Sequence, residues 1–246
     1  MLFYIVTARA QEHAIFLTDS LIKVNKVKSR SRISLGSGQS AVRDFYDSEG
    51  RLTKTENISV ADKQVMVTYF FYYNEKGLLV ASVGTKSGGF MFFPLLKNGF
   101  GENVDTILTR YQYNDSDRLV RIYMKEDHTG LLQYERLLFK NPDHTQTVFY
   151  TREGKIKLLT DEFFERENVI SKSIVNRYDT TGTLLSQNIQ EYENSFNEKG
   201  QLISIKYSCP KCNTEKKFEY FSNGLLSRKT KDKCMSNWKY SYSYYK

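Results

Sequence analysis

Three cysteines have the most distinctive spacing for chemistry in this sequence. Cys209 and Cys212 form a Cys-Pro-Lys-Cys segment, and Cys234 follows later in the chain. Such spacing occurs in disulfides, zinc sites and redox centres. A zinc site needs four ligands, and the three histidines, at positions 13, 128 and 144, lie far off in sequence. We favour a structural disulfide, in which Cys234 reaches Cys209 or Cys212 from the neighbouring hairpin, over free thiols.

A basic segment near the N-terminus is the second candidate. Its cationic residues are interleaved with apolar ones and are Lys23, Lys26, Lys28, Arg30 and Arg32. Two interpretations stay open: a phosphate-binding arm and a strand with one solvated face. The net charge of +8 fits both solvated surface lysines and attraction to an anionic polymer. The strand interpretation is the one we favour.

A glycine-rich segment, residues 84–104, is the third candidate. It contains an apolar run with the aromatic residues Phe90, Phe92 and Phe93. A glycine-rich loop can cradle phosphate, but the Lys-Ser/Thr pair of a nucleotide-binding loop is missing. We therefore predict a buried central hairpin here. An exposed apolar recognition loop is the alternative.

Catalytic motifs are not recognisable elsewhere in the sequence. It has no Gly-x-Ser-x-Gly and no His-Glu-x-x-His segment. The carboxylates, such as Asp161 and Glu162, lack the spacing of a catalytic pair, and His128 and His144 fall in expected turns. We expect a protein that is not an enzyme and needs no cofactor and no metal.

The elements that position these residues follow a seven-residue frame: aromatic, Asn or Asp, two polar residues, Gly, any residue, aliphatic. Clear copies begin at Tyr46, Tyr73, Tyr150, Tyr178, Phe196 and Tyr220. Two copies are degraded, since the one from Tyr113 has Asp117 in place of Gly and the one from Glu126 lacks the aromatic. The aromatic ends one strand, the Gly provides a positive φ in the turn, and the aliphatic begins the next strand.

The frame predicts an all-β protein, an extended antiparallel meander of repeated β-hairpins. We expect a curled or open, solenoid-like sheet with terminal strands as caps. Aromatic-rich composition, with 18 Tyr, 16 Phe and only 3 Pro, favours strands. Residues 161–176 are expected to form a hairpin too. The predicted turn glycines are Gly50, Gly77, Gly130, Gly154, Gly182, Gly200 and Gly224.

The N-terminal residues suggest targeting. Residues 2–7 are nearly all apolar, and Ala8-Arg9-Ala10 has the form of a signal-peptidase site. We interpret residues 1–10 as a truncated signal peptide, with an ordinary first strand as the alternative. Residues 11–40 are then an N-terminal strand and basic segment, and residues 41–246 are the repeat domain. No apolar stretch is long enough to predict a transmembrane helix.

The frame resembles the YD repeat of the RHS family, most closely at residues 46–52, 73–79, 178–184 and 196–202. This resemblance implies an exported bacterial repeat protein. We therefore expect a non-catalytic protein, secreted, periplasmic or in the cell envelope, whose sheet surface binds or scaffolds a protein or glycan partner. The alternatives are a cytoplasmic or surface binder of anionic glycan or nucleic acid through a basic, Tyr-rich face, and an enzyme with an unrecognised carboxylate site.

Overall fold

The computed structural model describes residues 19–34, 40–59, 63–86, 104–125, 129–139, 144–166, 169–209, 212–231 and 238–244. These residues form 17 strands and a short helix, α2. Every strand pair described in them is antiparallel. The prediction of an all-β antiparallel meander is confirmed. A search of the same residues for a helix long and apolar enough to cross a membrane finds none.

The chain divides into two compact units. Unit 1 comprises Met1–Phe70, Ser87–Phe93 and Tyr192–Lys246, and unit 2 comprises Phe71–Lys86 and Pro94–Glu191. Unit 1 thus contains residues from both ends of the chain, which the predicted succession of hairpins does not indicate.

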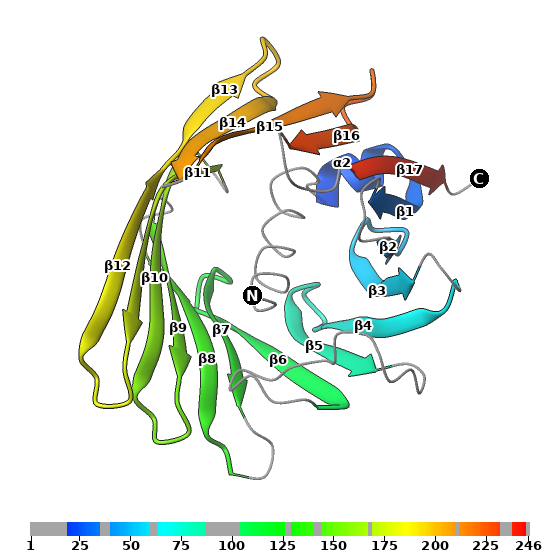
Figure 1. Cartoon of the computed structure of the whole chain (residues 1–246). Helices are drawn as coiled ribbons and strands as arrows, with labels where there is room; N and C mark the ends of the chain where they lie inside the picture. Colours follow the sequence, from blue (N-terminus) through cyan, green and yellow to red (C-terminus); the bar gives the residue numbers. More distant parts are fainter. Residues whose placement is uncertain are drawn as a thin grey trace. The chain divides into compact units, whose positions relative to one another are not determined.

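Unit 1 contains the helix and the first and last strands of the chain. Its elements are α2 (Asp19–Val24), β1 (Val27–Ser34), β2 (Ser40–Tyr46), β3 (Leu52–Ser59), most of β4 (Val65–Tyr73), β13 (Glu193–Phe196), β14 (Leu202–Cys209), β15 (Cys212–Tyr220), β16 (Leu226–Lys231) and β17 (Trp238–Tyr244). β13 to β17 pair in succession, as do β2 to β4. β1 lies between β17 and β2 and pairs with both (Figure 1).

The expectation of an open sheet with terminal strands as caps is therefore wrong for unit 1. Both edges of β1 are paired, one with β17 from the other end of the chain. A row of hairpins read along the sequence cannot reveal this pairing, because the two strands are joined by no turn.

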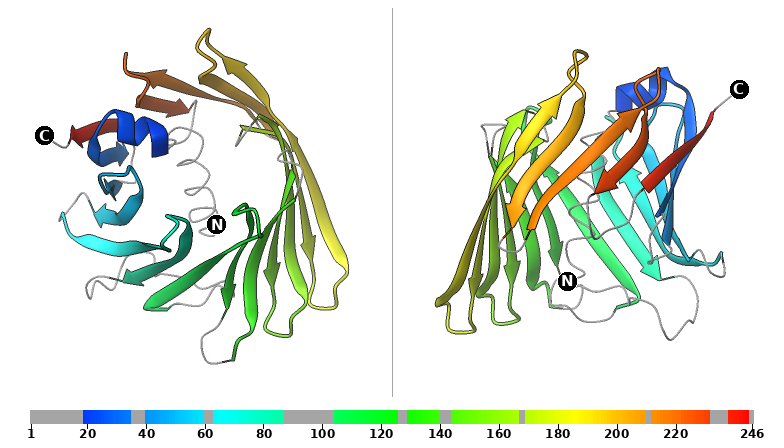
Figure 2. Two further views of the ribbon diagram at one scale, coloured as in Figure 1. Left: turned by 180° about the vertical axis from the view of Figure 1, so that it is seen from behind. Right: turned by 45° about the horizontal axis from the view of Figure 1, so that its top comes forward.

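Unit 2 is a meander in which strands that follow each other in the chain are neighbours (Figure 2). Its strands are β5 (Leu79–Lys86), β6 (Thr106–Tyr113), β7 (Leu119–Lys125), β8 (Leu132–Leu138), β9 (His144–Tyr150), β10 (Ile156–Arg166), β11 (Val169–Tyr178) and β12 (Leu184–Glu191). β10 and β11 are direct antiparallel partners. The predicted hairpin at residues 161–176 is confirmed.

The seven-residue frame sets the register of the hairpins. Its aromatic pairs with its aliphatic, as in Tyr46 with Leu52 and Tyr220 with Leu226. All seven glycines predicted for turns have positive φ, from 69° at Gly130 to 94° at Gly182. Asp117, which replaces Gly, also has a positive φ of 55°. Such backbone favours glycine and, after it, Asn and Asp.

Helix α2 was not predicted, because the segment around it was interpreted as a strand. It has six residues, too few for an isolated helix to be stable in water. The side chain of Ile22 is buried. Leu225, in the β15–β16 turn, and Leu226, which begins β16, are buried too. A Cβ atom placed on Gly224 would lie 3.7 Å from Cδ1 of Leu21. Tertiary packing on this turn therefore stabilises the helix.

Candidate functional site

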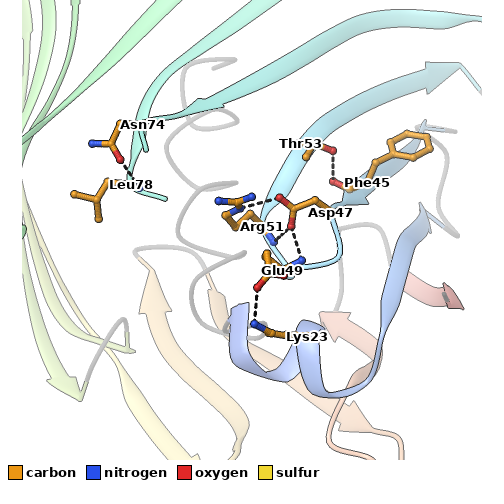
Figure 3. A network of polar contacts seen from close by, with 8 residues as sticks. All are labelled: Lys23, Phe45, Asp47, Glu49, Arg51, Thr53, Asn74 and Leu78. Atoms are coloured by element: carbon orange, nitrogen blue, oxygen red, sulfur yellow. Dashed lines mark hydrogen bonds and ion pairs between the residues drawn. The ribbon is translucent and has the colours of Figure 1, made fainter. Parts of the chain in front are cut away.

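Where the second residue of the frame is Asn or Asp, its side chain builds the turn. In the turn of residues 47–51, Asp47 accepts hydrogen bonds from the backbone N–H groups of Glu49 and Arg51 at 3.0 and 2.9 Å. The Asp47 carboxylate also pairs with the Arg51 guanidinium at 2.7 Å (Figure 3). In the next frame, Asn74 accepts from the N–H of Leu78 (Figure 3). These polar groups are used in turn formation, as Asx residues commonly are.

The basic segment does not form one surface. Lys26 and Lys28 are exposed, and Lys23 pairs with Glu49 of the β2–β3 turn (Figure 3). Arg30 and Arg32, in contrast, are buried. These two arginines lie on the covered face of β1, so their assignment to a surface binding arm is wrong. The favoured interpretation, a strand with one solvated face, describes the alternation in β1 better.

Arg30 belongs to a buried polar network across three neighbouring strands. Its Nε and Nη2 atoms donate to Oδ2 of Asp44 at 2.9 and 2.6 Å. The hydroxyl of Thr55 donates to Oδ1 of Asp44 at 2.8 Å. The Arg30 guanidinium also lies 5.8 Å from the centre of the Tyr240 ring. Asp44 is thus fully engaged, with an arginine on one oxygen and a hydroxyl on the other.

Unit 2 contains a network of the same composition. Nη2 of Arg136 on β8 donates to the Thr145 hydroxyl on β9 at 3.1 Å and contacts Oε2 of Glu162 on β10 at 3.0 Å. Arg136 and Thr145 are buried. In both units, therefore, an arginine and a carboxylate form an ion pair, and a threonine hydroxyl is hydrogen-bonded to the pair. The Glu162 carboxylate is thus paired with a buried guanidinium.

His144 lies at the start of β9 in a row of stacked rings. Its ring is 4.7 Å from that of Phe139 and 4.7 Å from that of Phe163, nearly parallel to each. Its Nε2 atom lies 3.1 Å from Oδ1 of Asp161, which also accepts from Gln146 at 3.1 Å. The expectation that His144 falls in a turn is wrong, since it begins β9, where it is half-buried. His128 lies outside the described residues.

Buried tyrosines make up much of the polar interior. Burial raises the pKa of Tyr46 well above its ordinary value of 10.0, and the positive charge of Arg30 only partly offsets this. Burial likewise raises the pKa of Tyr134 in unit 2. Tyr240 is buried, whereas Tyr72 and Tyr244 are half exposed. The expected Tyr-rich binding face is therefore divided between interior and surface.

We expect alkaline pH to destabilise the protein through these tyrosines. Above pH 10 the unfolded chain loses the Tyr46 proton that the folded protein keeps, so stability falls as pH rises. The slope is about 1.4 kcal/mol per pH unit for each such tyrosine. Urea unfolding at several pH values between 9 and 11 should show a shallower slope for Tyr46→Phe. Tyr72→Phe, at a half-exposed position, is the matched control and should leave the slope unchanged.

The cysteine segment is described only in its backbone. Cys209 and Cys212 are paired by Cα position as the last rung of the β14–β15 hairpin. Their side chains lie outside the described part of the chain, as does all of Cys234. Phe90, Phe92 and Phe93 also lie outside the described residues. The interpretations of a disulfide and of an apolar recognition loop or central hairpin stay predictions.

The surface residue set that sequence reasoning missed lies on β12. Leu185 and Ile189 are 66% and 53% exposed, and Ile189 pairs across the sheet with Ile174 of β11. We call Ile174, Leu184 and Ile189 the β12 patch, in which Leu184 is 49% exposed. Leu185 follows the aliphatic position of its frame and is the residue at which the β11–β12 register shifts. The frame could have indicated Leu185, because the residue after its aliphatic position is bulged and is left out of the strand ladder.

Comparisons with known proteins identify no family for this chain. No family model matches it, and no curated protein matches it. A solved structure of a porin-like protein from Bacteroides uniformis is 12% identical in sequence to this chain. The match covers 88% of this chain and 98% of that chain, with a TM-score of 0.40. A porin-like protein from Bacteroides vulgatus has 10% identity, the same coverage and a TM-score of 0.41.

A third solved structure covers only part of a much longer chain. The TcdB2–TccC3 structure without its hypervariable C-terminal region matches 78% of this chain but 12% of its own, with 13% identity and a TM-score of 0.19. These likenesses are too weak to carry an argument about function. The candidate site therefore rests on the geometry of the chain's own residues.

Proposed function

We propose that this is a non-catalytic, exported protein that binds a protein partner through the β12 patch of unit 2. The observation that carries the proposal is the exposure of β12. All of its residues but Gln190 are exposed, among them Leu184, Leu185 and Ile189. Large aliphatic side chains grouped on a surface are a common mark of a protein interface.

The surroundings of the patch support a protein partner. Leu184 and Ile189 pair directly with Tyr178 and Ile174, which lie four residues apart on β11, so Leu184 and Ile189 point to the same side of the sheet. Polar residues lie next to them on that side: Gln187 on β12, and the cross-strand pair Lys172 and Glu191. An apolar centre with a polar rim is the usual composition of a protein–protein interface. Aliphatic side chains offer little to a glycan or to nucleic acid, which are recognised by aromatic stacking and cations.

The buried ionisable groups support binding rather than chemistry. Asp44 and Glu162 are each held by an arginine and a threonine inside the sheet. The basic segment contributes less to a polyanion site than its sequence suggests, because Arg30 and Arg32 are buried. Export, and kinship with the YD repeat as a short and divergent member, are proposed from the frame and from apolar residues 2–7 followed by Ala8-Arg9-Ala10.

The test is crosslinking of the tagged full chain in its native host, followed by separation of envelope and cytoplasm. We expect the chain in the envelope fraction and a crosslinked product that Leu184→Lys with Ile189→Lys removes. Both side chains are exposed, so the free energy of unfolding of the variant should differ from that of the parent by about 0.5 kcal/mol or less. Affinity for the isolated partner should fall by about tenfold or more.

The matched control is Ile33→Lys, at an exposed aliphatic residue of unit 1. It introduces a single lysine on another strand and should leave the crosslinked product intact. A chain found in the cytoplasm, or a product that survives in the double variant, would refute the proposal. Steeply salt-dependent binding to nucleic acid or acidic glycan would favour the polyanion alternative instead.

A further inference from the structure

The hairpins of the frame share one irregular register. The aromatic at position 1 pairs with the aliphatic at position 7, the residue before the aromatic pairs with position 9, and position 8 is left out. This register occurs in the frames that begin at Tyr46, Tyr113, Tyr150, Tyr178, Phe196 and Tyr220. It is a β-bulge placed directly after the turn. The register is therefore a structural signature of the repeat.

β17 and β1 reproduce this signature although no turn joins them. Tyr244 pairs with Val27, Ser243 pairs with Ser29, and Lys28 is left out. Tyr244 thus occupies the position of the aromatic and Val27 that of the aliphatic. Val27 is buried, as the aliphatic is at Leu202 and Leu226. β1 therefore completes a repeat that β17 begins.

Side-chain contacts on both edges hold β1 in this place. Towards β17, the hydroxyls of Ser29 and Ser243 lie 2.7 Å apart, and the Arg30 guanidinium lies over the Tyr240 ring. Towards β2, Arg30 forms the buried ion pair with Asp44. β2 pairs with β1 from Ser29–Phe45 to Ile33–Ala41. Two kinds of contact are thus specific to the residue type: a buried aliphatic at position 27 and an arginine at position 30.

We infer that the space between β17 and β2 is a strand-binding site. Its ligand is an extended peptide with an aliphatic residue followed, three positions later, by an arginine that reaches Asp44. β1 is this ligand in the same chain, where Val27 and Arg30 provide the two groups. Backbone ladders on both edges provide the affinity, and the two side chains provide the selectivity, as in recognition by strand addition. This inference does not depend on the proposed partner of the β12 patch.

The first test uses the full chain, with Cys209, Cys212 and Cys234 replaced by serine. Ser29→Cys with Ser243→Cys places two thiols on directly paired residues, within the Cα spacing that a disulfide accepts. Oxidised glutathione, as the two-electron oxidant, should link the two thiols within one chain and release two glutathione thiols. Peptide mapping after proteolysis identifies the link.

The matched control is Ser29→Cys with Ser241→Cys, since Ser241 pairs with Ser31 and lies two residues out of register with Ser29. It should crosslink more slowly by about tenfold, because the diagonal separation of the Cα atoms is larger. Equal rates in the two variants would overturn the inference. A disulfide that joins two chains would also overturn it, because β1 would then bind a second copy.

The second test measures selectivity. A protease site inserted within residues 35–39 allows β1 to be separated covalently from β2 after folding. The cut protein should retain its N-terminal piece and exchange it for a labelled peptide of residues 25–34, measured by anisotropy. A peptide with Arg30→Ala should bind about tenfold more weakly, since it lacks a charged contact. Equal binding of both peptides, or no binding by the cut and still folded protein, would contradict the inference.

Discussion

Replacing Asp44 with alanine is expected to lower the free energy of unfolding by about 3–5 kcal/mol. Asp44 and Arg30 are almost fully buried, at 1% and 2% exposure. The variant would leave the Arg30 guanidinium without its carboxylate and the Thr55 hydroxyl without its acceptor. Arg32, whose Nε lies 4.0 Å from Oδ2 of Asp44, adds a second positive charge to the same site. Urea unfolding of the full chain measures the loss.

Two variants separate the ion pair from general effects of substitution. Arg30→Met and Arg32→Met with Asp44→Leu replaces the carboxylate and both arginines by apolar groups, and it should recover most of the lost stability, because none of these buried charges is then present. Glu49→Ala removes an ion pair with Lys23 in which both side chains are more than half exposed. That change should cost at most about 1 kcal/mol. A loss of similar size in Asp44→Ala would mean that the network does not stabilise the fold.

The turns of this protein follow directly from local chemistry, and for that reason the sequence predicted them. In the turns of residues 46–52, 73–79, 178–184 and 196–202, an aromatic, an Asx residue and a glycine form the turn through contacts within a few residues. Asp179, for example, accepts from the N–H groups of Thr181 and Thr183 at 2.8 and 2.9 Å. Such contacts require no partner from elsewhere in the chain. The strands between the turns followed from the same rhythm.

The polar networks could not be predicted in the same way. In the sequence, Arg30 belongs to a basic run. Its burial in unit 1 follows from the pairing of β1 with β2 and β17. The alternation in β1 indicates two faces but not which face is covered, since that depends on strands far away in sequence. Asp44 shows no pattern of its own, because it precedes the first frame by a single aromatic residue. Arg136 on β8 and Glu162 on β10 likewise show no pattern that joins them, since strand β9 lies between them.

Residues at the aliphatic position of the frame differ in burial although they occupy the same place in the repeat. Leu226 and Leu184 occupy the same place in their frames, each paired with a tyrosine at the same bulged register. Leu226 is 0% exposed, whereas Leu184 is 49% exposed. The difference comes from tertiary packing: Leu226 lies beside the β15–β16 turn that α2 packs on, and Leu184 lies on β12, which is exposed on both faces.

Leu226→Ala is therefore expected to destabilise the protein by about 2–5 kcal/mol, the cost of lost burial and of the cavity left behind. Leu184→Ala should cost about 0.5 kcal/mol or less, as exposed positions usually do. Urea unfolding of the two variants under one set of conditions makes the comparison. Local propensity and register are matched, so the difference between the two losses measures tertiary packing alone. Equal losses would show that the frame, and not the packing around α2, determines what this position contributes to stability.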